Sequence, residues 1–98
     1  MRLWPLTLAL AAASALTLPA QAQVNQVRVW AAACANCHGT DGRAQPGMEP
    51  LAGKTDIARK LLDFKSGSRP ATLMHQIAKG YSDEQIQQIA AYFAAQKP

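Results

Sequence analysis

Two thiols and one imidazole stand close together in the run Cys34-Ala35-Asn36-Cys37-His38. On a helical turn, positions i, i+3 and i+4 share one face, so Cys34, Cys37 and His38 would point to the same side. Two thiols on one face can form thioether bonds to the vinyl groups of a porphyrin while the imidazole coordinates its iron. The C-x-x-C-H spacing is typical of covalent haem c attachment. It predicts one haem held by Cys34 and Cys37, with His38 as an axial iron ligand.

Three other interpretations of these residues are open. A tetrahedral zinc site needs four ligands, but Cys37 and His38 are adjacent and only His75 remains as a fourth. A thioredoxin-like redox pair needs a βαβ context, and no strand pattern surrounds the motif. A structural disulfide between Cys34 and Cys37 is compatible with an exported protein. Haem is favoured because only haem uses all three residues at this spacing.

The iron of haem c has a second axial position, usually filled by methionine or histidine. Three residues are candidates for it: Met48, Met74 and His75. Met48 follows His38 by only 48 − 38 = 10 residues, in a loop expected to cover the histidine face. Met74 follows by 74 − 38 = 36 residues, after a predicted helix that can carry the chain to the opposite face. Met74 is therefore the predicted ligand, although a methionine there can also simply fill the core.

The N-terminus has the features of a secretory signal peptide over residues 1–22. Arg2 gives a positive start, residues 3–18 are mostly Leu and Ala, and Ala20-Gln21-Ala22 matches a cleavage site. The alternative is a membrane anchor, but the apolar run is shorter than the roughly 20 residues that a span needs. Cleavage would leave one domain over residues 23–98, that is 98 − 22 = 76 residues, in the periplasm. A domain of this size usually needs a cofactor or cross-link to be stable.

The formal charge of +4 becomes +3 if Arg2 is removed with the signal peptide. Six cationic residues lie between the C-x-x-C-H motif and the last predicted helix: Lys54, Arg59, Lys60, Lys65, Arg69 and Lys79. They form either ordinary solvated faces or a cationic rim that orients an acidic partner. No basic patch interleaved with aromatic residues is present, so nucleic acid is not an expected partner.

Helical periodicity dominates the rest of the chain. Apolar residues at positions 24, 27, 31 and 34 predict a first helix that runs into the motif and ends at Gly39. Residues 40–53 are rich in Gly and Pro and predict an irregular loop around the histidine side of the haem. The pair Thr55-Asp56 can cap a second helix, and an extended connection is expected over residues 68–74.

The last predicted helix begins at a capping box, Ser82-x-x-Gln85. Its expected buried face carries four apolar residues: Ile86, Ile89, Ala90 and Phe93. Strand-type alternation is absent from the sequence. The predicted fold is therefore all-α, with three main helices and long loops around one cofactor.

The order of these features resembles class I cytochromes c, in which C-x-x-C-H, a Pro-containing loop and a Met before the last helix follow one another. The resemblance implies that the first and last helices cross at one haem edge. It also implies that Pro50 and Leu51 lie against the histidine face of the haem. A backbone carbonyl there would accept a hydrogen bond from the second ring nitrogen of His38 and fix the ligand's orientation.

The chain is also similar to the cytochrome subunit of flavocytochrome c, a periplasmic sulfide dehydrogenase. Two runs carry this similarity: Asp-Phe-Lys-Ser-Gly at 63–67, and Met74 followed by Ile-Ala-Lys-Gly-Tyr-Ser at 77–82. It implies that Met74 is the second axial ligand and that the partner is an FAD-bearing subunit. The chain would then transfer electrons and would not be an enzyme by itself.

The sequence departs from that family in two ways. It has one C-x-x-C-H where some members have two haem domains in one chain. The family's loop often has a residue between the proline and the apolar position, whereas here Pro50 directly precedes Leu51. Two other functions are open. One is a free shuttle cytochrome that donates to an oxidase or reductase. The other is a haem-binding enzyme or sensor, which requires the second axial position to be empty or labile.

Overall fold

This computed structural model describes residue 2 and residues 25–98. The elements are α1 (Gln26–Ala32), α2 (Ala35–His38), the 3-10 helix η1 (Thr40–Gly42), α3 (Ile57–Ser66), α4 (Met74–Ala78) and α5 (Asp83–Ala94). Residues 25–98 contain no β-strand, which agrees with the all-α prediction. The predicted signal peptide lies outside the described residues. Within the described part of the chain, no helix has the length and apolar character to cross a bilayer.

The first predicted helix is in fact two helices. It begins at Asn25, whose side chain accepts a hydrogen bond from the Arg28 amide at 3.1 Å, and α1 ends at Ala32. The Cys34 amide then bonds to the Ala31 carbonyl at 3.0 Å, three residues back. This i→i+3 bond tightens the last turn, and α2 starts separately at Ala35. The prediction of one continuous helix into the motif was therefore wrong.

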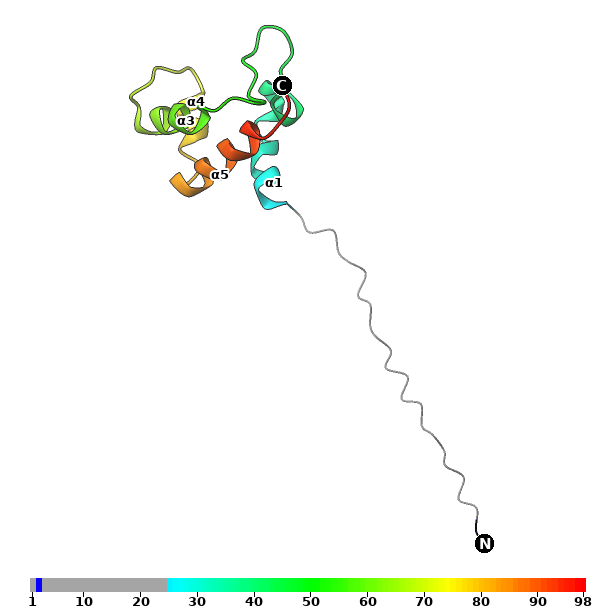
Figure 1. Cartoon of the computed structure of the whole chain (residues 1–98). Coiled ribbons are helices and arrows are strands. Elements are labelled where there is room, and N and C mark those ends of the chain that lie inside the picture. Colours follow the sequence, from blue (N-terminus) through cyan, green and yellow to red (C-terminus); the bar gives the residue numbers. More distant parts are fainter. Residues whose placement is uncertain (1, 3–24) are drawn as a thin grey trace.

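Helix α5 supplies four of the eight buried core residues in the described part of the chain. Figure 1 shows it between α1 on one side and α3 with α4 on the other. The capping box is present: the Ser82 hydroxyl accepts from the Gln85 amide at 3.1 Å, and the Gln85 side chain accepts from the Ser82 amide at 2.9 Å. All four residues of the predicted face are buried: Ile86, Ile89, Ala90 and Phe93. Ala31 of α1 and Ile57 of α3 complete the buried cluster around Phe93.

Helix α3 starts where it was predicted but without the predicted cap. Asp56 occupies the N-cap position, yet its side chain makes no capping hydrogen bond. It pairs instead with Lys60, one turn into the helix, at 3.2 Å. The C-terminal end is as expected, because Gly67 follows with φ = 84° and bonds back to the carbonyl of Phe64.

The connection after α3 is only partly extended. Residues 67–73 are irregular, but Met74 begins the five-residue helix α4, which the sequence analysis did not predict. The constraint that Pro70 places on Arg69 ends before this point, and Met, Gln and Ala in α4 are good helix formers. Helix α4 packs against α3, so Met74 is carried by a helix and not by a loop.

The loop after η1 is fastened at Gly42. The Gly42 carbonyl accepts hydrogen bonds from the amides of Leu51 at 2.9 Å and Ala52 at 3.1 Å. Gly42 has φ = 79°, and a Cβ there would lie 2.7 Å from the Ala52 nitrogen and 3.0 Å from a ring carbon of Phe93. Only glycine fits this close approach. The loop also joins α5, since the Gly53 amide donates to the Phe93 carbonyl at 2.8 Å.

Candidate functional site

The C-x-x-C-H residues lie on the short helix α2 and the turn before it. The His38 amide bonds to the Cys34 carbonyl at 2.9 Å, and the Cys37 amide bonds to the same carbonyl at 3.3 Å. These bonds give the i, i+3, i+4 arrangement that the spacing predicts. Cys34 is half-buried and Cys37 exposed, and the two thiols do not form a disulfide. Burial raises the pKa of the Cys34 thiol.

The His38 ring is held by a backbone carbonyl. Its Nδ1 lies 2.7 Å from the carbonyl oxygen of Glu49. A carbonyl can only accept, so Nδ1 must carry the proton, and Nε2 keeps a free lone pair. Imidazoles that ligate metals are usually oriented in this way. The resemblance had implied a carbonyl near Pro50 and Leu51, and the acceptor is the residue directly before Pro50.

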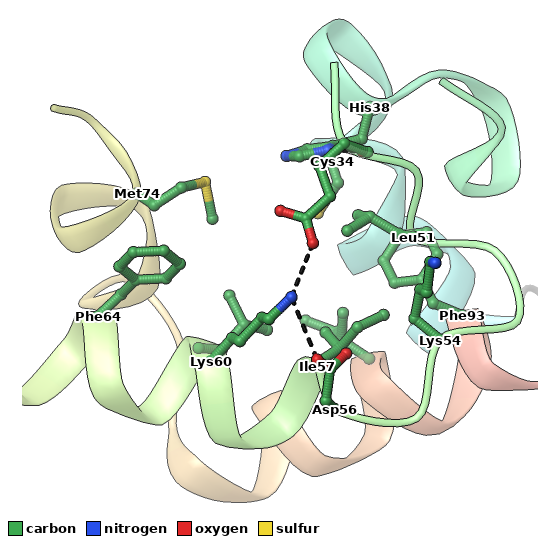
Figure 2. A pocket seen from close by; sticks show the side chains of 13 residues that line it. Cys34, His38, Leu51, Lys54, Asp56, Ile57, Lys60, Phe64, Met74 and Phe93 are labelled. Atoms are coloured by element: carbon green, nitrogen blue, oxygen red, sulfur yellow. Dashed lines mark hydrogen bonds and ion pairs between the residues drawn. The ribbon is translucent and has the colours of Figure 1, made fainter. Parts of the chain in front are cut away.

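Two adjoining cavities, of about 90 Å³ and about 400 Å³, open between α2, α3 and α4. Five residues line both of them: Cys34, His38, Glu49, Phe64 and Met74. Figure 2 shows the side chains of His38 and Met74 projecting toward the smaller cavity from different sides. Mostly apolar walls with a few polar groups are usual for cofactor sites. The free Nε2 of His38, two unpaired thiols and these apolar walls fit a covalently bound porphyrin.

The three candidates for the second axial position differ in their location. Met74, half-buried at the start of α4, lines both cavities. Met48 is 42% exposed and lines only the larger one. His75 lines neither cavity, and its half-buried ring has an Nδ1 without a hydrogen-bond partner. Of the three candidates, Met74 is the one that lines both of the cavities that His38 also lines.

Pro50 and Leu51 are separated by the structure. Leu51 lines the smaller cavity together with His38. Pro50 is exposed and lines a different cavity, with Arg43 and Pro98 among its neighbours. A direct contact of Pro50 with a haem therefore stays a prediction, whereas Leu51 lies where such a contact is possible.

A salt-bridged lysine next to His38 was missed by the sequence analysis, which counted it among the cationic surface residues. The Lys60 ammonium donates to Glu49 Oε1 at 2.7 Å and lies 3.2 Å from Asp56 Oδ2. Figure 2 shows both interactions as dashed lines within the pocket. These carboxylates raise the pKa of Lys60, and the bond from Lys60 lowers the pKa of Asp56. The i, i+4 spacing of Asp56 and Lys60 was the available signal.

Comparison with known families identifies the family of this chain. The family described as cytochrome c oxidase, cbb3-type, subunit III matches residues 22–93. The chain belongs to this cytochrome c family. Its cofactor is haem c with its iron, covalently bound. The class I cytochrome c fold is confirmed by the solved structure of Acidithiobacillus ferrooxidans cytochrome c4, which has a TM-score of 0.60 at 40% identity and covers 64% of this chain and 38% of that one.

Two curated relatives show the range of cytochromes to which this chain is similar. The cytochrome subunit of sulfide dehydrogenase from Chlorobaculum tepidum is 48% identical over 62 residues, which cover 61% of this cytochrome and 56% of the relative. The thiosulfate dehydrogenase electron acceptor from Stutzerimonas stutzeri is 41% identical over 103 residues, covering 94% of this cytochrome and 47% of the relative. This cytochrome thus spans about half the length of the curated relatives it matches.

Proposed function

We propose that this cytochrome c is a periplasmic one-electron carrier in which Cys34 and Cys37 bind the haem through thioethers and His38 and Met74 are the axial iron ligands. The observation that carries the proposal is the site around His38. Its Nδ1–H is bound to the Glu49 carbonyl, its Nε2 is free, and Met74 lines the same two cavities.

Haem c supplies the one-electron couple of its iron. His38 and Met74 would hold the two axial positions, which would leave no coordination site for oxygen or a substrate. Imidazole and thioether together should keep the reduction potential high relative to two histidines. Apolar residues around the cavity, among them Leu51, Leu61 and Phe64, exclude water and favour the less charged, reduced state.

The ligand assignment is tested with Met74→Ala and, as its matched control, Met48→Ala. Met74→Ala should lose the charge-transfer band of methionine-bound ferric haem and bind carbon monoxide when reduced. Met48→Ala should keep the wild-type spectrum, because Met48 lines only the larger cavity. The reverse result, with the band lost only in Met48→Ala, would exchange the roles of the two residues.

For the electron donor we propose an FAD-containing subunit of a sulfide dehydrogenase. Support comes from the Chlorobaculum tepidum relative, which is the cytochrome subunit of such an enzyme, and from the similarity over residues 63–67 and 74–82. The test is copurification from the periplasm with a flavoprotein, followed by stopped-flow reduction of the cytochrome on sulfide addition. Reduction at the same slow rate with and without the flavoprotein would contradict this partner.

A free shuttle cytochrome is the second candidate function. It is favoured by the relatives that are an electron acceptor of thiosulfate dehydrogenase and a cytochrome c4. A shuttle should elute alone from native periplasm and should exchange electrons with more than one redox protein at comparable rates. A subunit should elute in a stable complex, so gel filtration of the native extract separates the two functions.

A further inference from the structure

The carbonyl that orients His38 belongs to an exposed part of the loop. Glu49 lies in the stretch 45–50, in which every residue is exposed. The nearest backbone bonds on the C-terminal side are those of Leu51 and Ala52 to Gly42, and on the N-terminal side that of Met48 to Gln45. Among the described residues, no backbone hydrogen bond is made by the Glu49 amide itself. The bonds that do hold Glu49 are the one from His38 and the one from Lys60.

We propose that Lys60 is a positioning residue for the axial imidazole: its bond to the Glu49 side chain fixes the Glu49 carbonyl where the His38 Nδ1–H needs it. This inference rests on the proposed role of His38 as an iron ligand. It adds a charged residue to the contribution of α3, whose other residues in the site, Leu61 and Phe64 among them, are apolar.

Lys60 is suited to this role by its position. It stands on α3, whose Ile57 is anchored in the core, so the base of its side chain is fixed. Its side chain is only 28% exposed, against 56% for Glu49. Asp56, the N-cap residue of the same helix, forms a second ion pair with the Lys60 ammonium at 3.2 Å. Two acceptors restrict an otherwise flexible side chain and leave it aimed at Glu49.

The effect on the cofactor follows from the imidazole. A strong hydrogen bond at Nδ1 increases the basicity of the ligand and so stabilises the ferric state. Loss of Lys60 should weaken that bond and raise the reduction potential. It also removes a cation beside the cavity, which by itself lowers the potential. A control for the second effect is available in Lys54, which lines the same cavity and, among the described residues, makes no side-chain ion pair or hydrogen bond.

The test compares Lys60→Met with Lys54→Met in the haem-loaded protein, by NMR exchange of the His38 Nδ1 proton and by the reduction potential. Loss of a charge-assisted bond should speed exchange by about tenfold or more in Lys60→Met, with a potential above that of Lys54→Met. Lys54→Met should keep the wild-type exchange rate. Lys60→Arg should restore it, because arginine can still pair with Glu49.

A second variant, Glu49→Ala, tests the same bond in case Lys60→Met does not fold. Glu49→Ala removes the same bond from the other end but keeps the carbonyl, so it should speed exchange to the same extent. Equal exchange rates in wild type, Lys60→Met and Glu49→Ala would overturn the positioning role. Absence of paramagnetically shifted His38 ring signals in the wild type would refute His38 as a ligand instead, which is a separate outcome.

Discussion

Replacing Gly42 by Ala should destabilise the protein far more than replacing Gly47, although both glycines have positive φ. Their φ values are 79° and 94°, and a side chain in this region costs roughly 1–2 kcal/mol. Both changes also reduce the conformational entropy of the unfolded chain, which by itself raises the free energy of unfolding by about 0.4–1 kcal/mol. These two contributions are similar at the two sites and cancel when the variants are compared.

The difference lies in the space around each glycine. A Cβ on Gly47 meets nothing within 4 Å, whereas on Gly42 it meets the Ala52 nitrogen at 2.7 Å and the Leu51 Cβ at 2.9 Å. Both atoms belong to the segment that Gly42 itself holds by hydrogen bonds, so they cannot move without breaking those bonds. Overpacking of this kind costs about 1–3 kcal/mol. The free energy of unfolding should therefore be lower in Gly42→Ala than in Gly47→Ala by about that amount.

The assay is guanidinium unfolding of the haem-loaded proteins, followed by far-ultraviolet circular dichroism and by the Soret band. In Gly42→Ala the Soret transition should also precede the helical one, because the displaced segment leads to Leu51 and the Glu49 carbonyl at the site. If the two variants unfold at the same denaturant concentration, the close approach at Gly42 has been overestimated and the reasoning fails.

Three further predictions concern attachment, pH and capping. Cys37→Ser should leave a single thioether to the haem and lower accumulation of the holoprotein, measured by acid-acetone extraction and haem staining; a haem retained equally well in Cys34→Ser/Cys37→Ser would contradict covalent attachment. Burial and the hydrogen bond to Asp41 raise the pKa of Tyr92, so the folded protein keeps a proton that the unfolded chain releases. Stability should therefore fall as the pH rises above about 10. Tyr92→Phe, which keeps the ring and loses the phenol, should reduce this fall in denaturant unfolding measured at several pH values. Ser82→Ala removes one bond of the capping box and should lower the free energy of unfolding by about 1 kcal/mol, checked by thermal melts of the variant and the wild type.

Local patterns were sufficient to predict much of this fold. The face of α5 and its capping box follow from side-chain period and hydrogen-bonding groups within a few residues, and both are confirmed. The break between α1 and α2 was missed because Ala32 and Ala33 favour helix, and nothing in their types shows that the turn tightens at Cys34. Helix α4 is stabilised by packing on α3, a contact between distant segments that periodicity alone does not reveal.

The site was predictable to the extent that its chemistry is carried by side-chain type. Cys34, Cys37, His38 and Met74 could be chosen because few other groups bind a porphyrin or its iron, and their roles stay predictions. The acceptor for His38 could not be chosen, since every residue has a carbonyl and only the path of the loop selects Glu49. Lys60 was counted among surface cations because composition does not show which carboxylates lie opposite.

The order of the helices along the chain also determines when the fold can close. The buried cluster joins Ala31 near the start of the described chain to Ile89, Ala90 and Phe93 in α5, so it cannot assemble before α5 has been synthesised. Until then Cys34 lacks the buried cluster against which it packs in the fold. Afterwards it is half-buried with a raised pKa, and less of it is the reactive thiolate. Haem attachment should therefore be faster to a chain in which α5 has not yet packed on α1 than to the folded chain.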